Sequence, residues 1–119
     1  MVNTAWACGR LETQAPTLFA EIEKDARWMV QQASPHEVAN VAWACAKLAV
    51  AAPNFFTAIE NEAERLVLGL DSTTQSVSNT AWACGRLKTQ APTLFAEIEK
   101  DARWMLQQAS PHEVANVTW

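Results

Sequence analysis

The sequence predicts an all-α fold, a right-handed α-solenoid built from two-helix repeats with a period of 37–39 residues. Half of the 119 residues are hydrophobic and only three are glycine; much of the hydrophobic half is alanine, which favours close-packed helices over a sheet. The stretch "NTAWACGRL" at 3–11 recurs at 79–87, and a near copy, "NVAWACAKL", stands at 40–48. Repeats of this length without a strand pattern indicate paired helices stacked into an array.

The repeat divides the chain into one array of four units. The asparagine that leads each unit recurs at spacings of 37, 39 and 37 residues. The first and third units are almost one sequence, since 3–41 and 79–117 differ only at Glu12/Lys88 and Val30/Leu106. We expect a fragment of a longer array, whose uncapped ends make it marginally stable or prone to end-to-end self-association. The units are a truncated repeat 1 (1–33), repeat 2 (34–72), repeat 3 (73–109) and a truncated repeat 4 (110–119).

The first helix of each repeat is predicted from its start signal. In "SPHE", Ser34 can cap free backbone N–H groups, Pro35 suits the first helical position and Glu37 completes a capping box. We therefore expect a helix over about 35–48. The third repeat has only the weaker signal "DSTTQS" at 71–76.

The second helix is predicted to open at a proline in every repeat, at Pro16, Pro53 and Pro92, and to run over about 16–33 in the first. Apolar residues then recur at helical spacing and should face the core. These stripes are Phe19, Ile22, Ala26, Met29 and Ala33; Phe56, Ile59, Ala63, Leu66 and Leu70; and Phe95, Ile98, Ala102, Met105 and Ala109.

A helical wheel of the first helix separates two faces. Val38, Val41, Cys45 and Leu48 form an arc that should face the second helix, while an asparagine, a tryptophan and a basic residue share the other side. Stacked repeats would align these three types into a ladder, which we take as the candidate RNA-binding site. The ladder comprises Asn3, Trp6, Arg10, Asn40, Trp43, Lys47, Asn79, Trp82 and Arg86.

Each ladder position has a plainer structural interpretation. The asparagines can bond to a neighbouring repeat's backbone, the tryptophans can be wedged between adjacent first helices, and the cations can be ordinary solvated charges. Trp28 and Trp104 lie off the core stripe at a position taken by Arg65 in the middle repeat, which predicts a half-exposed site between second helices.

Charge is unevenly divided between the two kinds of helix. The net charge is −4, yet the first helices and their following loops carry four basic residues against three acidic ones, leaving five basic and ten acidic residues elsewhere. The acidity therefore belongs to the second helices, and the ladder side can still attract an anion. The acids of "EIEKDAR" are expected to form surface pairs, such as Glu23 with Arg27.

No enzyme, metal or cofactor motif is found, so the chain is predicted not to be an enzyme. Cys8, Cys45 and Cys84 share one repeat position on the core arc. Neighbouring helices are too far apart for a disulfide there, so we expect free thiols buried in the core. Free thiols fit a reducing, intracellular compartment. His36 and His112 are expected at the surface and make no metal site. No apolar run is long enough to span a membrane, and no signal peptide is visible.

The blocks "NTAWACGRL", "VANVAWACAKL" and "APTLFAEIE" resemble the helical repeats of octotricopeptide proteins and the related arrays of RAP-domain and FAST-kinase-like proteins. They are also similar to the array of the mitochondrial RNA-editing substrate-binding complex. This resemblance covers the whole chain and implies an α-solenoid that binds single-stranded RNA and acts in RNA processing, stability or translation in a mitochondrion or chloroplast.

Two other functions remain open. An armadillo/HEAT-like scaffold would use the same asparagine and tryptophan ladder to grip an extended peptide or partner protein, and a third possibility is a spacer between other domains. If each repeat meets one nucleotide, repeats 1 and 3 should prefer the same base, because their presumed reading faces match down to Thr4 and Thr80, whereas repeat 2 has Val41 there.

Overall fold

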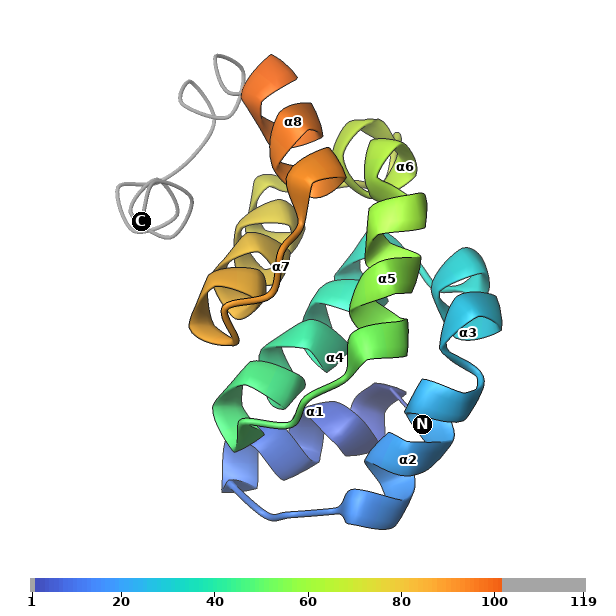
Figure 1. Ribbon diagram of the computed structural model, residues 1–119, viewed down its shortest axis with the longest axis vertical. Helices are drawn as coiled ribbons and strands as arrows, with labels where there is room; N and C mark the ends of the chain where they lie inside the picture. Colours follow the sequence, from blue (N-terminus) through green and yellow to red (C-terminus); the bar gives the residue numbers. More distant parts are fainter. Residues whose placement is uncertain (1, 102–119) are drawn as a thin grey trace.

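The computed structural model describes residues 2–101, which form helices and no strands (Figure 1). The all-α prediction is thus confirmed for this part of the chain. Expectations for Ala102, Trp104, Met105, Ala109, His112 and truncated repeat 4 lie outside the described residues. The helices are α1 (Val2–Leu11), α2 (Pro16–Lys24), α3 (Ala26–Gln32), α4 (Pro35–Leu48), α5 (Pro53–Asn61), α6 (Ala63–Leu68), α7 (Thr74–Arg86) and α8 (Pro92–Lys100).

The helices form two layers. In the first layer α4 lies between α1 and α7 and packs against both. In the second layer α5 packs against α2 and α3 on one side and against α8 on the other, and α6 also meets α8. The first helices α1, α4 and α7 therefore contact their counterparts in the next repeat, and so do α2, α5 and α8, which open the second helices (Figure 1). No helix within residues 2–101 is both long and apolar enough to cross a membrane.

The first helices begin where their caps allow. The predicted span 35–48 is confirmed by α4, which opens with a capping box in which the Ser34 side chain accepts from the Glu37 backbone and the Glu37 side chain accepts from the Ser34 backbone. A second capping box opens α7, between Thr73 and Ser76. A serine replaces the usual glutamate there, which is why the sequence signal is weak.

The second helices begin at Pro16, Pro53 and Pro92, as predicted. The single helix expected over 16–33 is wrong, because Asp25 departs from helical geometry at φ −109° and ψ 19° and separates α2 from α3. Glu62 does the same between α5 and α6. Neither break has a proline or glycine, the residues that mark a kink in a sequence.

The core stripes are largely confirmed. All five predicted positions from Phe19 to Ala33 are buried, as are the four from Phe56 to Leu66 and the arc of α4. The prediction that Leu70 belongs to the core is wrong, because this side chain is fully exposed. The helix ends at Leu68 and Gly69 turns the chain to extended geometry, so helical spacing no longer predicts which way the next side chain faces. Phe95 is half-buried against the core.

The second layer is joined across repeats by carboxylates. The Glu23 side chain accepts hydrogen bonds from the backbone N–H groups of Asn54 (2.9 Å) and Phe55 (2.8 Å) at the start of α5. Glu60 does the same for Thr93 and Leu94 at the start of α8, at 2.8 Å each. The residues preceding these helices are alanines, which cannot cap. The preceding repeat therefore supplies the cap, and interpreting Glu23 as a surface partner of Arg27 is wrong.

Arg65 makes a second link across the same junction. Its guanidinium donates to the backbone carbonyls of Val30 (2.6 Å) and Ala33 (3.0 Å) at the end of α3, where helix carbonyls lack intrahelical partners. Arg65 is half-buried, as predicted for this position. The equivalent Trp28 is 66% exposed, so the half-exposed site predicted for it is wrong.

Candidate functional site

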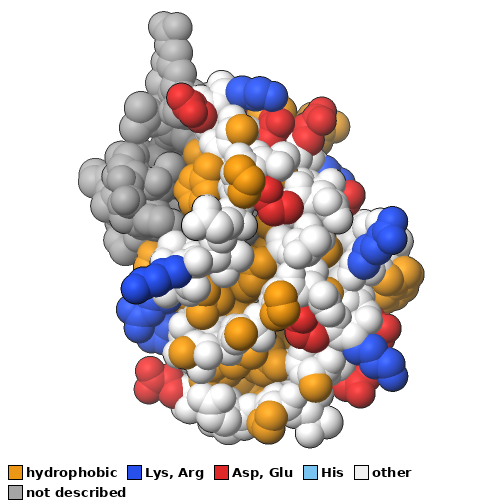
Figure 2. All heavy atoms as spheres, viewed as in Figure 1, with side chains coloured by type: hydrophobic (Ala, Val, Ile, Leu, Met, Phe, Trp, Pro, Cys, Tyr) orange, Lys and Arg blue, Asp and Glu red, His pale blue; other side chains and the backbone are white. Residues whose placement is uncertain are grey.

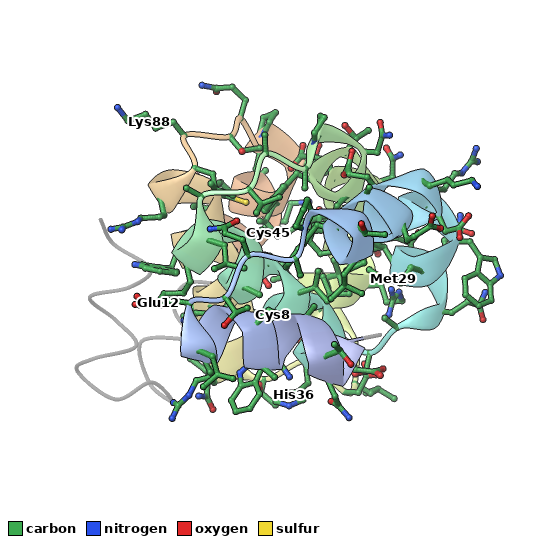
Figure 3. All side chains as sticks on the ribbon, turned by 90° about the horizontal axis from the view of Figure 1, so that it is seen from below. Cys8, Glu12, Met29, His36, Cys45 and Lys88 are labelled. Carbon is green, nitrogen blue, oxygen red and sulfur yellow. The ribbon has the colours of Figure 1, made fainter. Side chains whose placement is uncertain are left out.

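A hollow of about 520 Å³ opens on the first layer, and residues of α1, α4 and α7 line it. It faces away from the second layer: His36, on its wall, lies at the lower edge of Figure 3, on the opposite side of α1 from the buried Cys45. The residues that line the hollow are Asn3, Trp6, Arg10, His36, Asn40, Trp43, Gln75 and Asn79.

Six of the nine ladder residues line this hollow. The structure thus brings together the three asparagines, two tryptophans and one arginine that were predicted from three segments far apart in the sequence. Lys47, Trp82 and Arg86 do not line it. They lie on the same helices, α4 and α7, and complete the pattern there.

A cation sits over the ladder indole in each of the three described repeats. The Arg10 guanidinium carbon lies 5.5 Å from the Trp6 ring centre, the Lys47 ammonium lies 5.9 Å from that of Trp43, and the Arg86 guanidinium carbon lies 6.0 Å from that of Trp82. Each pair is four residues apart, so one helical turn brings cation and ring together. Such contacts stabilise by about 0.5–1 kcal/mol at exposed sites. They also hold the cations over the face of the first layer.

The tryptophans are neither fully wedged nor fully free. Trp6 is 41% exposed, while Trp43 and Trp82 are half-buried and pack against the core. Trp43 and Trp82 therefore contribute to packing and also leave an accessible part, whereas Trp6 is the more open ring. With a cation over one ring face, an incoming planar group meets the guanidinium or ammonium as well as the indole.

The charge around the ladder cations differs from one repeat to the next. Lys47 Nζ lies 3.8 Å from Glu12 Oε1, an exposed ion pair that contributes little to stability but offsets the positive charge. In repeat 3 the position of Glu12 is taken by Lys88, and both residues adopt the left-handed conformation at φ 54°. Figure 2 shows Lys and Arg side chains over the C-terminal ends of α4 and α7, with an acidic side chain over the end of α1.

Two wall residues were missed from the sequence. His36 and Gln75 each precede the ladder asparagine of their repeat by four residues, one helical turn, so they reach the same hollow. Conversely, Thr80 was expected on the reading face and is buried, and its equivalent Val41, which the wheel also places on the core arc, is buried as well. The Thr80 hydroxyl donates to the Ser76 carbonyl at 2.9 Å, so it is unavailable to a ligand.

Asn40 has a partner within its own helix. Its Nδ2 lies 3.4 Å from His36 Nε2. The roles in this contact depend on the His36 tautomer: the amide NH₂ donates where Nε2 is unprotonated, and the Asn40 carbonyl oxygen is then left for another donor. The plainer interpretation, a bond from this asparagine to a neighbouring repeat's backbone, is not what the structure shows here.

All three cysteines are free thiols, and two of them, Cys45 and Cys84, pack rather than react. Burial raises the pKa of the Cys45 and Cys84 thiols from 9.0 to about 12, with the Glu23 and Glu60 carboxylates adding to the effect respectively. Both thiols are therefore protonated at neutral pH and are poor nucleophiles. The burial predicted for Cys8 is wrong, because this thiol is only half-buried. Within residues 2–101, no cluster of three or more His, Cys, Asp or Glu side chains is arranged to hold a metal ion.

In comparisons with known proteins, no protein-family model, curated protein or solved structure matches this chain.

Proposed function

We propose that the repeats form a right-handed α-solenoid that binds single-stranded RNA along the first-layer face and catalyses no reaction. The hollow carries this proposal, because it gathers three asparagines and two tryptophans from the first helices of successive repeats beside a cation. Single-stranded RNA is recognised by amides at base edges, by stacking on aromatic or guanidinium planes and by cations at phosphates. The ladder supplies all three groups in each of the three described repeats.

Spacing also supports a periodic polymer as the ligand. Packed helices lie about 8–10 Å apart, and helical-repeat arrays in which each repeat meets one base are an established way to recognise RNA. The asparagines of α1, α4 and α7 come from three consecutive repeats and share one hollow, so consecutive nucleotides would meet equivalent groups.

An extended peptide is the second candidate. Amide side chains can bond to a peptide backbone as well as to a base, and the net charge of −4 disfavours a polyanion. The Glu12 carboxylate beside Lys47 points the same way. RNA is favoured because a cation accompanies each tryptophan on the ladder, a regularity that a neutral peptide backbone does not require. A role in organellar RNA processing, stability or translation rests on the repeat resemblance alone.

The test is RNA binding measured by fluorescence anisotropy at several salt concentrations. Replacing Arg10, Lys47 and Arg86 together by Gln should weaken binding of a single-stranded RNA and make the slope of log K against log salt shallower by about two, since each lost phosphate contact on a single strand contributes about 0.7. A matched control replaces Lys24, Arg27 and Lys100 of the second layer by Gln and should leave the slope largely unchanged.

Two outcomes contradict the proposal. If the ladder variant binds RNA like the parent at every salt concentration, the basic ladder does not contact the phosphates. If extended peptides displace bound RNA or bind when RNA does not, the hollow is a peptide site and the scaffold function is the better one.

A further inference from the structure

The hollow is lined by constant and by variable positions. Asparagine recurs in all three described repeats, tryptophan follows it three residues later and a cation four residues after that. The position four residues before the asparagine differs, with His36 in repeat 2 and Gln75 in repeat 3. A ligand that meets the same amide, indole and cation in every repeat gains no discrimination between repeats from them.

The other differences between these repeats do not reach the hollow. Val41 and Thr80 occupy equivalent places but are both buried. Lys47 and Arg86 differ as well, but neither lines the hollow, and both offer a positive charge suited to phosphate. Of the wall residues, His36 and Gln75 alone change their hydrogen-bonding chemistry from one described repeat to the next.

The two side chains present different groups. His36 is tied to Asn40 through Nε2 and offers a flat ring with one remaining nitrogen, whereas Gln75 offers an amide with both a donor and an acceptor. Both are exposed and stand on the first turn of their helices. Either can therefore contact a base without rearranging the core.

We propose that His36 and Gln75 determine which base each repeat prefers, so that base preference alternates along the array. This rests on the proposed RNA binding. The sequence repeats with a two-repeat period, since 3–41 recurs at 79–117, and an array of this kind fits a single-stranded RNA with a two-nucleotide repeat better than a homopolymer.

The test compares the parent with His36→Gln, which makes the walls of repeats 2 and 3 alike. Binding is measured for the four homo-oligomeric and six alternating single-stranded RNA 12-mers. The parent should bind an alternating oligomer best. The variant should shift by about fivefold toward a homo-oligomer, the size expected from one hydrogen bond. The reciprocal variant, Gln75→His, should shift toward a different homo-oligomer.

Asn61→His is the matched control, since it places an imidazole at an exposed amide of the second layer. It should leave the ranking unchanged, and thermal melts should show all variants folded. If the parent and His36→Gln bind RNA with the same ranking, or if Asn61→His changes it equally, the alternation is overturned while RNA binding stands. If none of the ten oligomers binds the parent, both proposals fail.

Discussion

The first and third repeats place the same residues in different surroundings. The segment 3–11 of repeat 1 equals 79–87 of repeat 3, and α2 and α8 have the same sequence. Yet Thr4 is exposed where Thr80 is buried, and Gly9 is buried where Gly85 is half-exposed. Identical sequence therefore does not fix the burial of these positions.

The difference separates two kinds of contact. The middle helix α4 lies between α1 and α7 and so meets opposite sides of the two copies. Gly9 faces α4 from one side, against Ala44 and Trp43. Ile22 and Ile98, by contrast, are buried in both copies. Positions buried in both copies belong to the core of a repeat, and positions that differ belong to the faces where repeats meet.

The largest effect is expected where both copies agree. Replacing Ile22 or Ile98 by Asp should each lower the free energy of unfolding by about 3–5 kcal/mol, because an unpaired charge would be buried. Lys24→Asp, on the same helix as Ile22, should cost far less. Urea denaturation measures all three variants, and equal losses at isoleucine and lysine would contradict the assignment of the core face.

The next effect should differ between the copies. Glu23→Ala removes the carboxylate that caps α5 and should cost about 1–2 kcal/mol, since two backbone N–H groups lose their acceptor. Its counterpart Glu99 is exposed, and Glu99→Ala should change stability by less than about 0.5 kcal/mol. Denaturation of the two variants side by side measures the difference, and equal costs would show that the cross-repeat cap contributes little.

These caps show what sequence patterns can and cannot predict. The prolines predicted the helix starts at Pro16, Pro53 and Pro92, and helical periodicity predicted the core stripes, because both depend on residues close in sequence. The cap from Glu23 joins residues more than thirty positions apart, and no local rule links them. The breaks at Asp25 and Glu62 likewise carry no local sequence signal.

The ladder of the candidate site could be predicted from local sequence, whereas two of its wall residues could not. Placing Asn40, Trp43 and Lys47 on one face requires only the geometry of one helix. Assigning the walls requires the neighbouring helices, because α1 and α7 decide which side of α4 stays open. Val41, which the wheel places on the core arc, is covered, whereas His36, one turn before Asn40 on the ladder side, is open.

Effects of opposite sign are expected at the equivalent glycines of the two copies. A Cβ at Gly9 would lie 2.9 Å from Ala44 Cα and 3.0 Å from a Trp43 ring carbon, so Gly9→Ala should push α1 from α4 and cost about 1–3 kcal/mol. Gly85 is half-exposed within α7, so Gly85→Ala should be neutral or stabilise by up to about 1 kcal/mol through helix propensity. Thermal melts would compare them, and equal destabilisation would mean that the two copies pack alike.

The last contrast concerns the reactivity of the cysteine thiols rather than stability. Cys8 is half-buried, whereas burial raises the pKa of its counterpart Cys84, and of Cys45, to about 12. A thiol pKa above the unfolded value means that the folded state holds the proton more tightly, so at pH 8 these two thiols carry about a thousandfold less thiolate than unfolded ones.

Iodoacetamide at pH 8 should therefore modify Cys8 first, with the other two reacting only in urea. Mass spectrometry of peptides after timed labelling would measure this order, and equal rates at Cys8 and Cys84 in the folded protein would show that the two repeats shield their thiols alike.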